Sequence, residues 1–392
     1  MQNTSNDKVW FAHMLRGVAC LIVVFFHYCL IFWSEHEGIT NLYSLIPIVI
    51  SSDMNLLSLS SFLNSINVNL GSVGVGLFFI ISGFVIPFSF NSTSSLMFLI
   101  KRFFRIIPPY AIGLFLTLFA VYLYAKYNNF EFTYTFLDYI VNLSLLRDWF
   151  DVFGFRSIDG INWTLQIEMK FYFICALIAL ISSLKSNKTL IITSSIMLAI
   201  TVFLNLTSGS FNIYFDYFLR VTSAPFFHLT YMMIGICFYN FFKKNWTSST
   251  FIATTSFIVV ATIVILYLLQ PGSFKQSFVS YGFALIMFGV FYYFKEKLSF
   301  NPILNFFANI SYPLYIVHGL IGYILITVFY SILPNAYIVI MIVFSIVVTL
   351  SYLLHRFIEL PSVQLGKLVA EKYKQVKTTK INIKQNKINS TS

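Results

Sequence analysis

The chain has 392 residues, of which 58% are hydrophobic and 10% are charged. Soluble globular domains carry about 25% charged residues, so the composition excludes that class and predicts an all-α polytopic integral membrane protein. No hydrophilic block is long enough to bury a core of its own, so we expect one membrane domain. The formal net charge of +11 resides mainly between the hydrophobic runs, and we interpret it as a topology signal rather than a nucleic-acid-binding surface.

Ten hydrophobic runs are long enough to cross a bilayer, which takes about 20 apolar residues in a helix. They lie near residues 10–33, 71–90, 106–126, 163–183, 189–206, 225–242, 250–269, 276–294, 306–330 and 336–358. The first run is too long for a signal peptide and contains Arg16, so we expect it to remain in the mature protein.

Positive charge alternates from one connection between these runs to the next. One set of connections carries Lys8, then Lys101, Arg102 and Arg105, then Lys185 and Lys188, then Lys243 and Lys244, then Lys295 and Lys297. Cytoplasmic loops are enriched in Lys and Arg, so about ten transmembrane helices with both termini in the cytoplasm are predicted. Residues 1–361 are then the membrane domain. Residues 362–392 form a basic cytoplasmic tail, expected to be disordered or to lie against the anionic inner leaflet.

The first hydrophobic run contains two ionisable residues, Arg16 and His27. Such a group in the hydrocarbon costs several kcal/mol unless it faces a partner or a watery cavity, which makes it a functional candidate. Eleven residues are about three helical turns, so both side chains leave one face of the helix, roughly 16 Å apart along its axis. The alternative is a histidine bonded to a neighbouring helix and an arginine that extends to the inner surface.

A carboxylate in the fourth run offers a partner for the imidazole. Glu168 lies five residues into a helix that begins at Trp163 and runs from outside to inside. It is therefore expected about 9 Å below the outer surface, at the depth of His27. A carboxylate there would orient the imidazole and stabilise its protonated form, as a general base requires. The alternative is a structural ion pair with Lys170 or Arg147.

Arg102 and Arg105 lie three residues apart at the cytoplasmic end of the third run and share a helix face. Guanidinium groups bind phosphates through paired hydrogen bonds. An ordinary positive membrane anchor explains such a cluster equally well when it is taken alone. The position of Arg16 on the same side of the membrane favours the phosphate interpretation.

Further polar residues are possible cavity-lining groups, namely Ser82, Trp163, Tyr315 and His318. Ser82 has no base next to it in the sequence, whereas Pro313 frees a carbonyl inside the ninth run and puts Tyr315 and His318 on one face. Arg356 and Glu359 are spaced for a structural pair. The loop from 147 to 163 mixes aromatic and acidic residues, which suit either a sugar-like acceptor or an interfacial aromatic belt. The cysteines indicate neither a metal site nor a disulfide framework.

These residues together resemble the membrane acyltransferase family 3, which includes bacterial O-acetyltransferases of O-antigen, peptidoglycan and other glycans. The resemblance spans about residues 8 to 361. Its motifs are Leu15-Arg16-Gly17 with His27 at an Arg-x10-His spacing, Phe79-Ile80-Ile81-Ser82-Gly83-Phe84, Arg102-x-x-Arg105 before Pro108 and Tyr110, Trp163-Thr164-Leu165-x-x-Glu168, Ser311-Tyr312 to His318, and Arg356-Phe357-x-Glu359-x-Pro361. Each motif is weak alone, and the set in this order is specific.

The resemblance implies an acyl-CoA donor reached from the cytoplasm and an acceptor hydroxyl on the outer side. It marks Arg16 and His27 as essential and puts Arg102 and Arg105 at the donor's phosphates. Some family members carry a fused extracytoplasmic hydrolase-like domain after the last helices. This sequence has a short Lys-rich tail there, so the membrane domain is expected to complete the transfer itself or to pass the acyl group to a separate protein.

We therefore expect a multi-pass enzyme of the bacterial inner membrane. It would transfer an acyl group, expected to be acetyl, from acyl-CoA to a hydroxyl of an envelope or exported glycan such as O-antigen, peptidoglycan or exopolysaccharide. No metal and no nucleic-acid partner are expected. The rival interpretation is a transporter or flippase of a glycan intermediate, whose buried charges would line a path. Transporters often contain inverted repeats, and no such repeat is apparent in this sequence.

Overall fold

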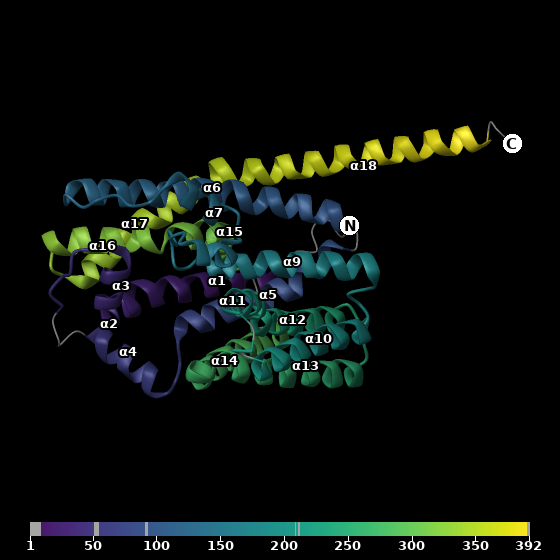
Figure 1. Ribbon diagram of the computed structural model, residues 1–392, viewed down its shortest axis with the longest axis horizontal. Coiled ribbons are helices and arrows are strands. Elements are labelled where there is room, and N and C mark those ends of the chain that lie inside the picture. Colours follow the sequence, from purple (N-terminus) through teal and green to yellow (C-terminus); the bar gives the residue numbers. More distant parts are fainter. Residues whose placement is uncertain are drawn as a thin grey trace.

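A computed structural model describes residues 9–50, 55–90, 93–207, 209–210, 212–298 and 300–389, with side chains described as far as residue 375. The described residues form helices and connecting loops without any β-strand (Figure 1). Most of the longer helices run side by side along the long axis of the molecule. The all-α prediction is therefore confirmed.

The longer helices are α1 (Trp10–Phe25), α5 (Leu70–Ser89), α6 (Ser95–Tyr127), α9 (Trp163–Ile181), α10 (Asn187–Leu206), α11 (Ile213–Ser223), α12 (Phe226–Phe242), α13 (Ser248–Leu269), α14 (Phe274–Tyr293), α15 (Pro302–Val317), α16 (Leu320–Ile332), α17 (Ala336–Leu354) and α18 (Leu360–Asn389). Two π-helical segments continue α1 and α17, η1 (Phe26–Ile31) and η4 (His355–Glu359). Shorter elements are α2 (Phe32–Ser34), α3 (His36–Tyr43), α4 (Asn55–Ser65), α7 (Phe136–Leu143), α8 (Arg147–Phe150), η2 (Asp151–Phe153) and η3 (Pro271–Ser273).

In the described part of the chain, nine helices are long and apolar enough to cross a membrane. A tenth span results if α15 and α16 are counted together, since this pair passes the same test but is bent by 77°. The ten predicted runs are thus recovered, with one correction. The run near 306–330 is not one helix, because the chain breaks at His318 and Gly319. Gly319 leaves room there for Asp159, since a β-carbon at this position would lie 2.9 Å from the Asp159 carboxylate.

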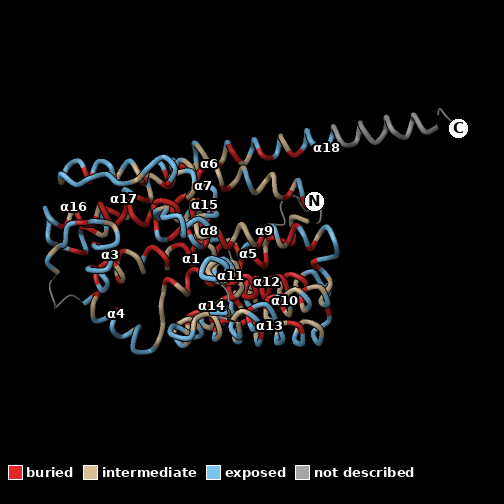
Figure 2. The backbone as a smooth tube through the Cα atoms, viewed as in Figure 1, coloured by how far each residue is buried: buried red, intermediate tan, exposed pale blue. Residues whose placement is uncertain are grey.

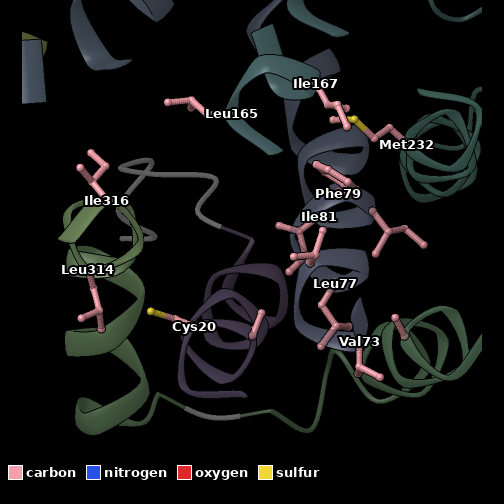
Figure 3. Close-up of a cluster of buried hydrophobic side chains, with 14 of the residues drawn as sticks. Cys20, Val73, Leu77, Phe79, Ile81, Leu165, Ile167, Met232, Leu314 and Ile316 are labelled. Atoms are coloured by element: carbon pink, nitrogen blue, oxygen red, sulfur yellow. The ribbon is translucent and has the colours of Figure 1, made fainter. Parts of the chain in front are cut away.

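Helix α5 is the centre of the bundle and packs against α1, α12 and α14. Figure 2 shows buried residues concentrated on the inner helices, with exposed residues on the outward faces of the peripheral ones. In Figure 3, Val73, Leu77 and Ile81 extend from α5 into the apolar interior, and Cys20 of α1 points toward α15. Gly83 allows this packing, because a β-carbon there would overlap the Met232 carbonyl of α12.

The chain after residue 361 differs from the disordered tail that was expected. It forms the helix α18, which follows η4 directly and packs along α6, where Gly366 lies against Phe104. Lys, Leu and Gln are frequent in this segment, and these residues favour helix even without a continuous apolar face. Figure 1 shows α18 extending beyond the end of the bundle. Residues 390–392 lie outside the described residues.

Alternating helix directions bring several connections to the same end of the bundle. Lys185, Lys243 and Lys295 occupy the α9–α10, α12–α13 and α14–α15 connections. We call this end of the bundle the basic end. The connection before α9 and the connection between α13 and α14 lie at the opposite end.

Candidate functional site

A cavity at the middle of the bundle brings together several of the predicted site residues. It offers about 70 Å³ of free space between α1, α5, α6, α9 and α15. Its lining residues are Arg16, Val75, Phe78, Phe79, Ser82, Arg105, Ile106, Thr164, Leu165, Glu168, Tyr172, Ser311, Tyr312 and Tyr315. We call it the central cavity. Charged groups and tyrosines are set among apolar walls, so the cavity suits a ligand with a charged part and a less polar part.

The arginines gather around one part of the central cavity. Arg16 and Arg105 both line it. Arg102 lies behind Tyr172, where its guanidinium is 5.1 Å from the ring centre and its Nη2 donates to Ser89 Oγ at 3.1 Å. The structure therefore brings the residues that were grouped as phosphate ligands into one neighbourhood, although only two of the three line the cavity.

Glu168 lies in this arginine cluster and not beside His27. It accepts hydrogen bonds from Ser82 Oγ, at 3.1 Å, and from the Tyr172 hydroxyl. Neither it nor His27 has the other among its contacts in the described structure, so the predicted Glu168–His27 pair is wrong. The depth estimate failed because the chain enters the bundle before α9 begins. Ile158 and Asp159 are already buried, so the packed bundle does not end at Trp163, where α9 begins.

His27 instead meets residues of the broken helix pair. It lies in the π-helical segment η1, a kind of irregularity that is frequent at functional sites. Its Nδ1 is 2.6 Å from the Tyr323 hydroxyl, and its ring centre is 4.9 Å from that of His318 in an edge-on arrangement. The imidazole partner of His27 is therefore a second histidine, 291 residues further along the chain.

The hydrogen bonds of His318 determine which of its nitrogens carries the proton. Nδ1 is 3.0 Å from the Leu314 carbonyl oxygen and 2.9 Å from that of Tyr315. Both partners only accept, so Nδ1 must donate, and Nε2 of the neutral ring is left as an acceptor. The side chain is fully buried, and Nε2 has no hydrogen-bond partner among the described residues. A buried acceptor without a partner is unusual in a folded protein.

Tyr315 connects the central cavity with the two histidines. Its side chain lines the cavity, and its ring centre is 5.6 Å from that of His318. Its hydroxyl donates to the Ile161 carbonyl at 2.6 Å and accepts from Thr164 Oγ1 at 2.5 Å. The cavity-lining predictions for Ser82 and Tyr315 thus agree with the structure, whereas His318 lies behind Tyr315.

Trp163 faces away from the central cavity. It lines a second cavity, on the other face of α9, and its ring centre is 5.1 Å from that of His228. The expected Arg356–Glu359 pair is also replaced, because Glu359 Oε2 is 2.6 Å from His355 Nδ1 within η4. A π-helix has more residues per turn than an α-helix, so different side chains become neighbours in η4.

Asp159 and Tyr323 are residues near the site that the sequence did not assign to it. Asp159 was noted only as one acid in the outer loop, yet its carboxylate lies against Gly319, beside His318. Burial raises the pKa of Asp159 to about 6, and the backbone N–H groups of Ile161 and Leu320 partly oppose this shift. No local signal marks either residue, because the helix break that brings them to His318 depends on packing between distant segments.

Residues 9–356 match the family model of acyltransferase family 3, which is described as an acyltransferase domain. No curated protein and no solved structure gives a match to the chain. The matched residues include α1 through the start of η4, and so the central cavity, both histidines and the arginine cluster. The chain belongs to acyltransferase family 3 and is a membrane acyltransferase.

Proposed function

We propose that this acyltransferase moves an acyl group, expected to be acetyl, from acyl-CoA to a hydroxyl of an envelope or exported glycan. It would act in the bacterial inner membrane, with the basic end in the cytoplasm. The observation that carries the proposal is the arrangement of the central cavity. Arg16 and Arg105 line it together with Tyr315, and the His27–His318 pair lies outside the lining, next to Tyr315.

The donor's charge distribution fits this arrangement. Arg16 and Arg105 would bind the phosphates of acyl-CoA, and Arg102 would add positive charge from behind Tyr172. Apolar walls formed by Val75, Phe78 and Leu165 would contact the less polar arm of the donor. Glu168 then acts as a positioning residue in the arginine cluster, since it holds Ser82 and Tyr172 and interacts electrostatically with Arg16.

His27 would act as the general base. It takes the proton of the acceptor hydroxyl while the hydroxyl oxygen attacks the thioester carbonyl. The carbon–sulfur bond then breaks, and the CoA thiolate leaves with the proton that His27 returns. For base action through Nε2, Nδ1 of His27 donates to the Tyr323 oxygen. The neutral ring of His318, whose centre is 4.9 Å from that of His27, would stabilise the imidazolium that forms. A covalent acyl-histidine intermediate would use the same residues.

Thiol release from acetyl-CoA by the purified protein tests the proposal. We expect slow release by the wild type and a decrease of about 10²–10⁴-fold in His27→Ala, the range that a general base supplies. His13→Ala is the matched control, because His13 lies on the same helix but bonds Asn305 and lines neither cavity. Its release should equal that of the wild type.

Two outcomes would contradict parts of the proposal, and a third would call for a different variant. Unchanged release in His27→Ala would move the base elsewhere, to His318 first. Loss of release in His13→Ala as well would indicate that α1 does not tolerate substitution, and His27→Gln would then replace alanine. Absence of both release and acetyl-CoA binding, even with glycans added, would favour the glycan transporter.

A further inference from the structure

A second cavity lies between α9 and the group formed by α11, α12 and α14. It offers about 610 Å³ of free space. Its polar lining groups include Asp148, Asp151, Lys170, Tyr217, His228 and Gln270. Trp163 is the first residue of α9 and Pro225 immediately precedes α12, so the cavity lies at the end of the bundle opposite the basic end.

His228 is a deeply buried polar group of this cavity. Only 7% of its surface is exposed, and its Nδ1 is buried without a hydrogen-bond partner among the described residues. Its ring is held between aromatic rings, with centre-to-centre distances of 5.4 Å to Phe79 and 5.7 Å to Tyr281. Buried polar atoms are normally paired, so an imidazole held in place without a partner for its Nδ1 points to a ligand that supplies one.

The charges of the second cavity distinguish it from the arginine cluster. Lys170 faces Asp148 and Asp151 across the cavity, and Arg147 pairs with Asp151 at 2.7 Å from outside the lining. The charges of these side chains cancel, so the cavity does not attract an anion such as a nucleotide or a phosphate. Carboxylates, an ammonium, an amide and a phenol instead offer donors and acceptors to a neutral ligand with several hydroxyl groups.

Helix α9 separates the two cavities, and two consecutive residues of this helix line one cavity each. Trp163 lines the second cavity, while Thr164 lines the central cavity and donates to Tyr315 beside His318. The Trp163 ring is 6.3 Å from Phe79, and these two rings form the wall between the cavities. A ligand against Trp163 is thus one side chain away from the path that leads to the two histidines.

We propose that the second cavity is the acceptor subsite and binds an uncharged sugar ring, with Trp163 contacting its apolar face and Asp151, Lys170 and His228 bonding its hydroxyl groups. The proposal rests on the proposed function for the destination of the acyl group. The binding itself does not depend on acyl-CoA, so the two can fail separately.

Sugar binding can be measured directly, without any turnover. The probes are methyl glycosides of glucose, galactose, rhamnose and N-acetylglucosamine, titrated into the purified full-length protein while tryptophan fluorescence is recorded. We expect a saturable change with at least one glycoside that disappears in Trp163→Phe. The dissociation constant should rise at least tenfold in Asp151→Asn and in Lys170→Met. Glu131→Gln is the control, since Glu131 is an exposed acid that lines neither cavity.

His228→Phe separates binding from folding. Phenylalanine retains the aromatic packing but removes both ring nitrogens, so we expect weaker glycoside binding with an unchanged or higher melting temperature. If none of the glycosides binds the wild type, or if the variants bind as tightly as the wild type, the acceptor subsite is elsewhere. If binding behaves as expected but acetyl-CoA yields no thiol, the subsite stands and the proposed donor is wrong.

Discussion

Asp159 is a buried acid beside the candidate catalytic histidines, and its pKa reflects how far this region is shielded from water. It is 3% exposed, its Oδ1 accepts from the Ile161 N–H at 3.2 Å, and its Oδ2 has no hydrogen-bond partner among the described residues. Burial raises its pKa from the ordinary 3.8 to about 6. The acid is thus more easily protonated in the folded protein than in the unfolded chain, because its charged form has lost most of its water.

This shift predicts a pH dependence of stability. Where the folded protein binds the proton and the unfolded chain does not, the free energy of unfolding falls as pH rises. The stabilisation is therefore complete below pH 3.8 and is lost by about pH 6, at up to about 1.4 kcal/mol per pH unit. We expect Asp159→Asn to reduce this slope, because asparagine cannot ionise but can still accept from Ile161.

Melting temperatures in detergent between pH 4 and pH 7 measure this effect. Asp216→Asn is the control, since Asp216 accepts from Gly209 in another loop and is not fully buried. A slope that is the same in Asp159→Asn and in the wild type would show that Asp159 is solvated.

At the scale of elements, the contact between α5 and α12 is the most demanding in the bundle. A β-carbon at Gly83 would overlap the Met232 carbonyl, and one at Gly235 would overlap the Ile80 carbonyl. These are contacts with backbone atoms, which cannot be relieved by rotating a side chain. Helices α5 and α12 can therefore pack this closely only with glycine at both positions.

Gly83→Ala should consequently destabilise the protein, by about 1–3 kcal/mol or more, the usual cost of overpacking a core. Gly282→Ala is the matched control, because a β-carbon there meets nothing within 4 Å and alanine favours helix. We expect a lower melting temperature for Gly83→Ala and an equal or higher one for Gly282→Ala. Equal melting temperatures for both variants would mean that α5 and α12 are further apart than the structure describes.

The break between α15 and α16 is the second feature on which the candidate site depends. The bend of 77° brings His318 to the end of α15 and starts α16 at Leu320, which places Tyr323 beside His27. The Tyr28 hydroxyl donates to the His318 carbonyl at 2.8 Å and so satisfies backbone that the break leaves free. An unbroken helix would not place these residues together.

At the scale of the whole molecule, orientation in the membrane remains a prediction from the loops. The distribution of Lys and Arg puts the basic end in the cytoplasm. We expect a cysteine at Glu131, near the opposite end, to react with a membrane-impermeant thiol reagent in intact cells. A cysteine at Lys185, on the basic end, should react only after the membrane is opened. Both positions are exposed.

The native cysteines provide little background for this experiment, because Cys20, Cys175 and Cys237 are buried and Cys29 is only partly exposed. Replacing Cys29 by serine gives a suitable starting variant. Labelling of the Lys185 position in intact cells, with protection at Glu131, would invert the topology and place the arginine cluster on the outer side.

The sequence by itself determined the class of protein, the number of membrane spans and the candidate site residues that share one helix. Apolar length and alternating loop charge are local properties fixed by bilayer thickness, so the ten runs could be located directly. Arg16 with His27 and Arg102 with Arg105 were visible because each pair shares one helix. Tertiary structure alone decided which residues meet across helices.

Contacts between helices explain each difference between the predicted and the observed site. Glu168 lies among the arginines because the chain is already buried before α9 begins. His27 contacts His318 because the helix pair α15–α16 breaks at Gly319. The second cavity likewise draws its lining from α5, α9, α11, α12 and α14. Such contacts depend on how whole helices pack, and helix packing follows from side-chain shape over distant segments rather than from the periodicity of any one of them.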